Sequence, residues 1–312
     1  MHDFLCIDIG GTNLKYAVIN HAGEMIIHDK VKTPAQDLGT FMAVIYRILD
    51  QHSQHISGIA ISVPGQVDPA TGIVYHGGSL PFLDKINFPE LIHKRYGLEI
   101  SVHVENDGKA GALAELWLGS LKDVQNGAAI ILGTGVGGGL ILNGQLFYGS
   151  HFQAGELSFM FTDTSQSMNR GIVGINASAV GMVKTIADKI GLPKNQDNGL
   201  AVFQHIQNGD SRAVIPFQQY CRNVAYLILN IQTVVDLTTF AIGGGISRQG
   251  IVTETINAQY DALLNENMIV KESLSRPKIK QAAFGNDANL FGALYSLFMA
   301  QDHTGMAEKN IS

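Results

Sequence analysis

The chain has 312 residues, long enough for two domains with sizeable cores, and its 46% hydrophobic and 15% charged residues are typical of a globular protein. Its 21 basic and 27 acidic residues give a net charge of −6 without a basic run, which argues against nucleic acid as a partner. Neither cysteine lies in a zinc or disulfide spacing. Without a signal-like first segment or an apolar run of roughly 20 residues, we expect a cytoplasmic protein with no membrane span.

The first half of the sequence predicts a series of strands and two helices. Apolar residues at helical spacing mark the helices, and short apolar runs bounded by turn residues mark the strands. Cys6 lies in the first strand pattern and Cys221 in a later helical stretch, so both are expected to be core thiols. The expected strands are 4–9, 14–20, 25–33, 58–63 and 100–105, and the expected helices are 39–52 and 109–118.

The second half repeats this plan with more helix. A hairpin over 129–142 continues through an Asn143-Gly144 turn into 145–148, and a final helix, 287–301, is expected to pack on the first domain. The polar tail 303–312 is expected to fray. Further helices are expected at 173–191, 199–208, 211–235 and 251–265, and further strands at 238–242 and 279–284.

This order of elements predicts an α/β fold with mixed sheets. We expect two α/β domains. The smaller one comprises residues 1–118 and 288–312, and the larger one comprises residues 119–287.

Two glycine-rich turns carry the strongest functional signal. One contains Gly10, Gly11 and Thr12, and the other runs from Gly133 through Thr134 to Gly135; each separates two apolar strands. Glycine permits backbone conformations with positive φ, so such a turn can direct several N–H groups at one anion. Two of them in one chain suggest two halves that grip one polyphosphate.

Asp8 stands at the end of an otherwise apolar strand just before the first turn. An ionised carboxylate among apolar neighbours is costly unless something pairs with it. A magnesium ion, held directly or through water, would do so. The alternative is that Asp8 caps the turn by accepting hydrogen bonds from nearby N–H groups. The local sequence leaves both open.

Residues 133–138 also satisfy the dinucleotide fingerprint G-x-G-x-x-G. That fingerprint requires the glycines to open a helix, whereas here a β-branched and apolar run and an Asn-Gly turn follow. The pattern therefore argues against a hydride-transferring dehydrogenase. The chain contains no G-x-x-x-x-G-K-[ST], which excludes a P-loop enzyme.

Asn106 and Asp107 stand where a buried strand becomes a helix, a usual place for sites in α/β proteins. Asp107 could accept a proton from a hydroxyl that attacks a phosphate, and Asn106 could hydrogen-bond a sugar diol. Alternatively, either residue caps the helix, which the local sequence alone favours. The run Gly243, Gly244 and Gly245 could lie against an adenine or ribose, or be a flexible turn, and Glu156 by itself reads as a surface residue.

Taken together, these segments resemble the ROK family of sugar kinases and sugar-responsive repressors, within the actin-like ATPase (ribonuclease H-like) superfamily. The similarity follows the same order along nearly the whole chain. Its motifs are two phosphate turns (8–13 and 133–139), a sugar-domain motif (64–69 with 72–74), the catalytic segment (105–107), the A-G-E motif (154–156) and the adenosine motif (242–245).

The resemblance implies an ATP-dependent sugar kinase that uses Mg²⁺ and has Asp107 as the catalytic base. It further implies that Asp8 helps to hold the magnesium ion, and it suggests a homodimer. The implied ATP-binding residues are Asp8, Gly10, Gly11, Thr12, Gly133, Thr134, Gly135, Gly243, Gly244 and Gly245, and the implied sugar-binding residues are Gly65, Gly78, Asn106, Asp107 and Glu156.

The chain departs from the family pattern where the family holds a zinc ion. Ser158 and Phe159 stand where the family has Gly-His, and residues 168–177 lack the zinc cysteines, so no zinc is expected. Ala177 stands where the family has a second sugar-contacting Glu. Phe159 could stack on a sugar or aglycone, although its apolar neighbours favour a core position.

These losses predict a pocket open at the anomeric end of a hexose, large enough for an aglycone or a second sugar. Residues 58–62, 77–79 and 161–163 are also similar to the β-glucoside kinase branch, which phosphorylates the 6-hydroxyl of such disaccharides. Glucose, fructose and N-acetylmannosamine remain alternative substrates. A sugar-binding protein without catalysis is a further alternative, whereas a repressor is disfavoured because the chain starts directly at the first phosphate strand.

Overall fold

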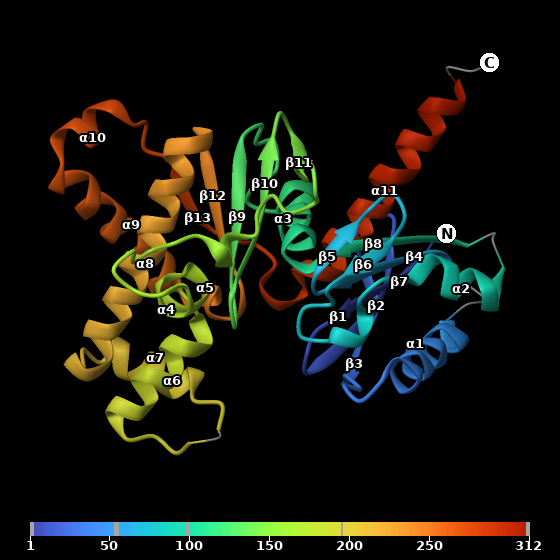
Figure 1. Cartoon of the computed structure of the whole chain (residues 1–312), viewed down its shortest axis with the longest axis horizontal. Coiled ribbons are helices and arrows are strands. Elements are labelled where there is room, and N and C mark those ends of the chain that lie inside the picture. Colours follow the sequence, from blue (N-terminus) through green and yellow to red (C-terminus); the bar gives the residue numbers. More distant parts are fainter. Residues whose placement is uncertain (1–2, 53–55, 98–99, 195, 310–312) are drawn as a thin grey trace. The chain divides into compact units, whose positions relative to one another are not determined.

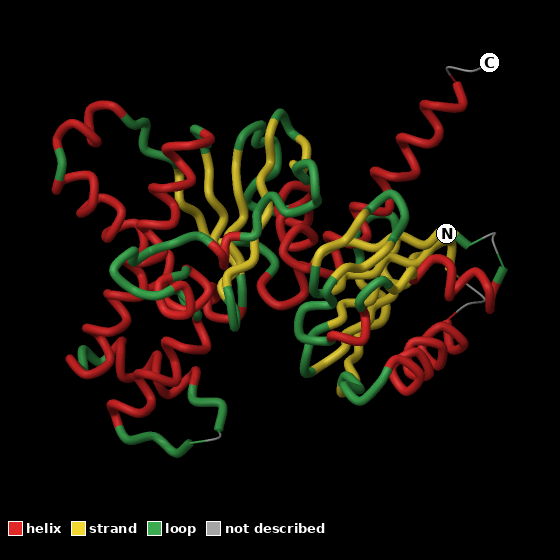
Figure 2. The backbone as a smooth tube through the Cα atoms, viewed as in Figure 1, coloured by secondary structure: helices red, strands yellow, loops and turns green. Residues whose placement is uncertain are grey.

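The computed structural model describes residues 3–52, 56–97, 100–194 and 196–309 and divides the chain into two compact units. The first unit comprises residues 1–117, 148–153 and 287–312, and the second comprises 118–147 and 154–286. In each unit a mixed sheet packs against helices, which confirms the predicted α/β class (Figures 1 and 2).

A five-stranded sheet of order β3-β2-β1-β4-β8 forms the centre of the first unit. The strands β1, β4 and β8 are parallel, so their carboxyl ends meet at one edge, while β2 runs antiparallel to β1 and β3. A small three-stranded sheet, β5-β6-β7, follows β4 in the chain. The bounds are β1 Asp3–Ile9, β2 Asn13–Asn20, β3 Met25–Lys32, β4 Ile56–Val63, β5 Gln66–Asp68, β6 Ile73–Tyr75, β7 Ile86–Asn87 and β8 Ser101–Asn106.

Helices cover both faces of this sheet because its strands alternate two sets of apolar side chains. Leu5 and Ile7 belong to the core cluster that includes α1 and α2, whereas Phe4 and Cys6 belong to the cluster that includes α11. The last helix thus packs on the first strands, as the sequence predicts. The bounds are α1 Leu38–His52, η1 Pro81–Leu83, α2 Phe88–Tyr96, α3 Asp107–Leu118, η4 Gly285–Asp287 and α11 Ala288–Lys309.

The second unit has a five-stranded sheet of order β11-β10-β9-β12-β13 and the largest core cluster, which α6, α7, α8 and α9 share with β9 and β12. Cys221 of α8 is buried there, and Cys6 is buried in the first unit, so both are core thiols as predicted. The bounds are β9 Gly127–Leu132, β10 Val136–Leu142, β11 Gln145–Phe147, β12 Thr239–Gly243, β13 Lys278–Gln281, η2 Leu157–Phe159, α4 Met168–Gly171, α5 Val173–Asn176, α6 Ala179–Ile190, α7 Gly199–Gln207, α8 Ser211–Val235, η3 Gly245–Arg248, α9 Gly250–Glu266 and α10 Met268–Ser273.

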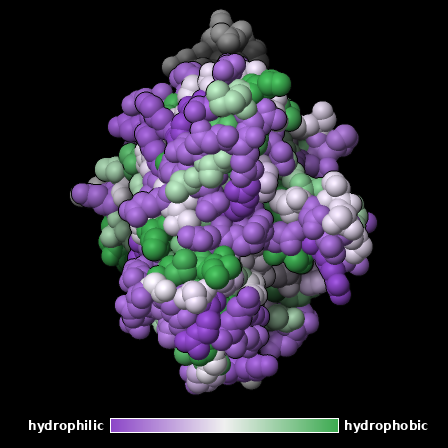
Figure 3. Space-filling model, turned by 90° about the vertical axis from the view of Figure 1, so that its left-hand side faces the viewer, coloured by the Kyte–Doolittle hydropathy of each residue, from purple (hydrophilic) through white to green (hydrophobic). Residues whose placement is uncertain are grey.

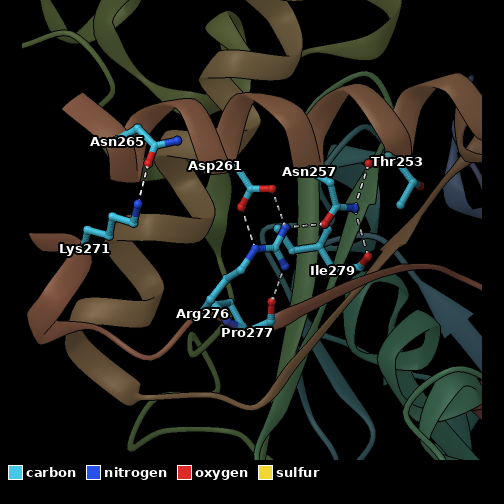
Figure 4. A network of polar contacts seen from close by, with 8 residues as sticks. All are labelled: Thr253, Asn257, Asp261, Asn265, Lys271, Arg276, Pro277 and Ile279. Carbon is cyan, nitrogen blue, oxygen red and sulfur yellow. Dashed lines mark hydrogen bonds and ion pairs between the residues drawn. The ribbon is translucent and has the colours of Figure 1, made fainter. Parts of the chain in front are cut away.

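A polar network fixes the edge strand β13 against α9 (Figure 4). The Arg276 guanidinium donates to the Asp261 carboxylate at 2.6 Å and to the Asn257 amide oxygen at 2.9 Å. The Asn257 amide in turn donates to the Ile279 carbonyl at 3.0 Å. The strand that ends the second sheet is therefore held by side chains as well as by its pairing with β12.

Several predicted elements were wrong in part; the expected strand 279–284, for example, is β13 and ends at Gln281. The expected helix 173–191 is two helices, because Ser178 caps α6 by accepting from the Gly181 N–H at 2.9 Å. Helix α3 begins at Asp107, two residues earlier than predicted. Helix α11 continues to Lys309, so residues 303–309 are helical instead of frayed, and 310–312 lie outside the described residues.

Within the part of the chain that the structure describes, no helix is long and apolar enough to cross a membrane. The face drawn in Figure 3 is mostly hydrophilic, and its hydrophobic side chains lie in separated patches. Exposed Leu200, Ile215, Val234 and Ile269 are spread over three helices of the second unit, α7, α8 and α10. These residues do not single out a surface for the expected homodimer, which stays a prediction.

Candidate active site

The carboxyl edge of the first sheet carries a row of polar side chains. The register pairs Asp8 of β1 with Ser62 of β4, and Ser62 with Glu105 of β8. All three are buried, with Asp8 6% exposed and the other two fully enclosed. Asp8 and the segment that carries Asn106 and Asp107 thus lie at the same edge of the sheet, with β4 between them.

The first glycine turn lies at this edge and is exposed. Gly11 and Thr12 are exposed, while the buried Thr33 supports the turn by donating its hydroxyl proton to the Gly10 carbonyl at 2.6 Å. A Cβ added to Gly11 would lie only 2.8 Å from the Ser79 hydroxyl oxygen. The turn therefore packs closely against the loop that also contains Gly78.

Asp8 is paired by side chains of its own unit. Its carboxylate accepts from the Ser62 hydroxyl at 3.2 Å and from the Asn289 amide at 3.0 Å, and the Lys15 ammonium lies 3.6 Å away. Lys15, which follows the first turn on β2, therefore pairs with Asp8 instead of being only a solvated surface charge. These three side chains pair with the Asp8 carboxylate, a role for which the sequence suggested a magnesium ion or the N–H groups of the turn.

The donor set at Asp8 fits a magnesium ion that is reached through water. The Asp8 side chain is only 9% exposed, and the described residues contain no group of three or more His, Cys, Asp or Glu that could hold a metal. Mg²⁺ keeps several of its waters and commonly binds through one or two carboxylates together with substrate phosphates. One buried carboxylate below a phosphate-type turn suits that mode of binding.

Asn106 fixes the position of Asp107. Its amide oxygen accepts from the Lys109 N–H at 3.0 Å, which caps α3, and its amide nitrogen donates to the Gly65 carbonyl at 2.8 Å and to Asp107 Oδ1 at 3.1 Å. The capping role that the local sequence favoured for Asn106 is thus present. Asp107 is partly exposed at the positive end of the α3 dipole, which favours an ionised carboxylate.

Gly65 and Gly78 lie side by side next to Asn106. Gly65 has φ 97°, and a Cβ on it would be 2.9 Å from both the Gly77 nitrogen and the Tyr75 oxygen. A Cβ on Gly78 would be 3.2 Å from the Gly65 nitrogen. The structure therefore brings together Gly65, Gly78, Asn106 and Asp107. Glu156 belongs to the second unit, and its grouping with them stays a prediction.

Glu105, fully buried beside this group, is a residue that the sequence analysis did not single out. Its carboxylate accepts from the Tyr148 hydroxyl at 2.6 Å, the Asn106 N–H at 2.8 Å and the Ser296 hydroxyl at 3.0 Å. Burial raises the pKa of Glu105, while these hydrogen bonds and the charge of Lys109 oppose the rise. The Ser296 hydroxyl is also 2.8 Å from a His103 ring nitrogen.

His103 makes stability depend on pH in a defined window. Burial lowers the pKa of His103 from 6.5 to about 4, so the folded protein keeps this imidazole neutral. Between pH 6.5 and about 4 the unfolded state binds the proton more readily, and stability that is present above pH 6.5 is lost as the pH falls. We expect a loss of about 3 kcal/mol over this window.

The raised pKa of Glu105 acts in the opposite direction, because it increases stability as the pH falls. The effect of His103 is therefore measured as the difference in stability between wild type and a variant without this histidine. The free energy of unfolding of wild type and of His103→Gln, measured with denaturant between pH 4 and 7, should converge as the pH falls. Two curves that stay parallel would contradict the assignment to His103.

In the second unit, two serines hold the second glycine turn. Ser178 donates to the Thr134 carbonyl at 2.7 Å, and Ser158 accepts from the Val136 N–H at 2.9 Å. A Cβ on Gly135 would be 2.9 Å from the Ser158 hydroxyl oxygen. The Ser158 side chain, which stands where the family has a glycine, thus connects the turn before β10 to the residues that follow the A-G-E motif.

A cavity of about 490 Å³ lies beside this turn, within the second unit. Gly133 and Gly245 both line it, so the structure brings the second phosphate turn and the glycine run together. Gly243 ends β12 and is buried, and Gly244 has φ 97° and lies so close to Leu132 that a Cβ there would overlap the Leu132 backbone. The other lining residues come mainly from α6, η3 and the segment 196–203.

The segment 168–177, which replaces the zinc motif, is exposed over residues 168–170 and partly buried from Gly171 onward. Phe159 is 69% exposed, so the expectation of a core position is wrong, and Met168 is 65% exposed. Ala177, in contrast, is fully buried in the large core. The Glu156 carbonyl accepts from the Phe159 N–H at 3.3 Å, which places both residues in one short turn.

Comparisons with known proteins identify the family of this chain. A model of the ROK family matches residues 4–300. A β-glucoside kinase of Listeria innocua is 30% identical over 298 residues, which cover 95% of this chain and 97% of that protein. A β-glucoside kinase of Klebsiella pneumoniae is 29% identical over 294 residues, or 92% and 93% of the two chains.

Among solved structures, a ROK family protein from Streptococcus pneumoniae in complex with sucrose has a TM-score of 0.84 and 28% identity, with 96% of this chain and 99% of that chain covered. The six sequence motifs, the two mixed sheets and the match of the family model over nearly the full length all point to the same family. The chain belongs to the ROK family.

Proposed function

We propose that this protein is an ATP-dependent sugar kinase that transfers the γ-phosphate to the 6-hydroxyl of a sugar. The observation that carries the proposal is the placement of Asp107 at the start of α3, fixed by Asn106 beside Gly65 and Gly78. The same unit contains a glycine turn suited to phosphate. The relatives named β-glucoside kinase support a kinase over a binding protein without catalysis.

In the proposed reaction, Asp107 accepts the proton of the sugar 6-hydroxyl. The oxygen of that hydroxyl bonds to the γ-phosphorus, and ADP departs as the bond between the β- and γ-phosphates breaks. The transition state is loose in most analyses of phosphoryl transfer, so positioning and neutralisation of charge dominate the rate. Gly65, Gly78 and Asn106 orient the sugar, and Glu156 remains a proposed sugar ligand from the second unit.

For the nucleotide, we propose that the 490 Å³ cavity receives the adenosine. Gly245 lets the backbone approach a flat group, and Gly133 with Thr134 and Gly135 faces the phosphates, as do Gly10, Gly11 and Thr12 in the first unit. Gly243 and Gly244, which directly precede Gly245 in the chain, remain proposed nucleotide contacts. Asp8 would hold Mg²⁺ through water, and the bound ion would neutralise phosphate charge.

We further propose a β-glucoside disaccharide as substrate, with glucose, fructose and N-acetylmannosamine as alternatives. Phe159 offers an exposed ring one turn from Glu156, and an aromatic face suits a sugar or an aryl aglycone. The similarity to β-glucoside kinases and to a family member solved with sucrose supports an acceptor larger than one hexose.

The test is an ADP-release assay with Mg-ATP and a panel of acceptors: glucose, fructose, mannose, N-acetylmannosamine, cellobiose, gentiobiose and an aryl β-glucoside. Higher kcat/KM for the β-glucosides than for every monosaccharide is the expected result. Preference for a monosaccharide would keep the kinase and reject the disaccharide. Sugar binding without turnover would favour the regulatory alternative, and light scattering would test the proposed homodimer.

A further inference from the structure

The buried carboxylate of Glu105 belongs to a closed ring of polar contacts around the proposed sugar site. Glu105 accepts from the Asn106 N–H, and Asn106 donates to the Gly65 carbonyl. The next residue, Gln66, donates from its amide to the His151 carbonyl at 2.5 Å. Three residues before His151 in the chain, the Tyr148 hydroxyl returns to Glu105 at 2.6 Å.

The segment 148–153 is the part of this ring that comes from far along the sequence. It belongs to the first unit although both its neighbours in the chain belong to the second, and it leads directly into the A-G-E motif. Phe152 within it has φ 59°, a left-handed conformation that is unusual for a bulky residue. Such backbone strain persists only where surrounding contacts over-determine the conformation.

We propose that Glu105 and Tyr148 are positioning residues for the sugar: Glu105 orients the Asn106-Asp107 turn, and Tyr148 ties the segment 148–153 to that turn. The inference rests on the proposed function, because it assigns these residues to the same sugar site. Neither side chain needs to touch the substrate, since both act through Asn106, Gln66 and the backbone of the segment.

A carboxylate suits this role because it only accepts hydrogen bonds when ionised and can take several at once. Glu105 uses one oxygen for the Asn106 N–H and the other for Tyr148 and Ser296. The Glu105 carboxylate therefore fixes the Asn106-Asp107 turn and the segment 148–153 relative to each other. Displacement of reacting groups by about 1 Å can lower a rate about 10²-fold, so such an anchor has a kinetic consequence.

Two substitutions at the same carboxylate oxygen provide a matched comparison. Tyr148→Phe removes the donor that comes from the segment 148–153, whereas Ser296→Ala removes the donor that comes from α11, which carries no proposed sugar ligand. We expect Tyr148→Phe to lower kcat/KM for the sugar about 10²-fold, with the KM for ATP unchanged. We expect Ser296→Ala to keep sugar kcat/KM within a few-fold of wild type while lowering the melting temperature.

Glu105→Gln adds a second variant, and sugar affinity measured by calorimetry adds a readout that does not need turnover. The expected result is weaker sugar binding in Glu105→Gln and Tyr148→Phe and unchanged binding in Ser296→Ala. If wild type turns over sugar and Tyr148→Phe behaves like Ser296→Ala, the inference is overturned and the proposed function stands. If wild type neither binds nor phosphorylates any sugar of the panel, the proposed function fails and the inference fails with it.

Discussion

Asp107→Asn lowers kcat by about 10²–10⁴-fold, the usual contribution of a general base. The amide keeps the size of the side chain and can still accept the Gly108 N–H that Asp107 Oδ1 accepts at 2.7 Å, so the start of α3 should persist. It cannot take the proton of the attacking hydroxyl. Nucleotide binding should be retained, because the proposed ATP contacts lie on the glycine turns and in the 490 Å³ cavity.

The measurement is ADP release under saturating sugar, together with nucleotide affinity by calorimetry. Asp37→Asn is the matched control, because Asp37 accepts the Thr40 N–H near the start of α1 in the same unit and has no proposed catalytic role. We expect the control to retain wild-type kcat. An Asp107→Asn variant with wild-type turnover would remove Asp107 from the mechanism.

Gly244→Ala should lower the free energy of unfolding by about 3 kcal/mol and abolish the stabilisation of the protein by ATP. Gly244 has φ 97° and ψ 174°, a region that is essentially open to glycine alone, and its Cβ would overlap the backbone of Leu132. Because Leu132 directly precedes Gly133, relief of the overlap displaces the second phosphate turn and the wall of the cavity. Thermal unfolding with and without Mg-ATP measures both effects.

Gly191→Ala is the control for Gly244→Ala, because it introduces backbone strain without steric overlap. Gly191 has φ 80°, but a Cβ there would meet nothing within 4 Å. We expect this variant to lose only about 1 kcal/mol of stability and to keep its ATP-induced rise in melting temperature. Equal losses in the two variants would show that contact with Leu132 does not matter.

Local patterns predict much of this fold. The two hairpins around the glycine turns and the long helix α8 follow directly from alternating or helical apolar spacing and from turn glycines. Short elements such as β5, β6 and β7 lack enough residues for a periodic signal, and the sequence analysis did not predict them. The break before α6 depends on one capping serine inside an otherwise helical pattern.

The surroundings of the site could not be predicted because they depend on contacts between distant residues. Asn289 reaches Asp8 from the other end of the chain, and Tyr148 reaches Glu105 from the end of the predicted segment 145–148, whose pattern carries no sign of this contact. Lys15 faces Asp8 because their strands pair in register, which a hairpin pattern implies but which the sequence analysis did not use. Phe159 lies in an apolar run, yet its short 3-10 turn leaves the ring in solvent.

The packing of α11 has a consequence for the order in which the protein is made on the ribosome. One face of the first sheet, with Phe4 and Cys6, is covered by Leu290, Leu294 and Leu297 of the last helix. A chain is synthesised from its N-terminus, so this apolar face forms early and stays uncovered until residues 290–297 emerge. The first unit therefore cannot be completed before α11 is made, and chains that stop before α11 should aggregate.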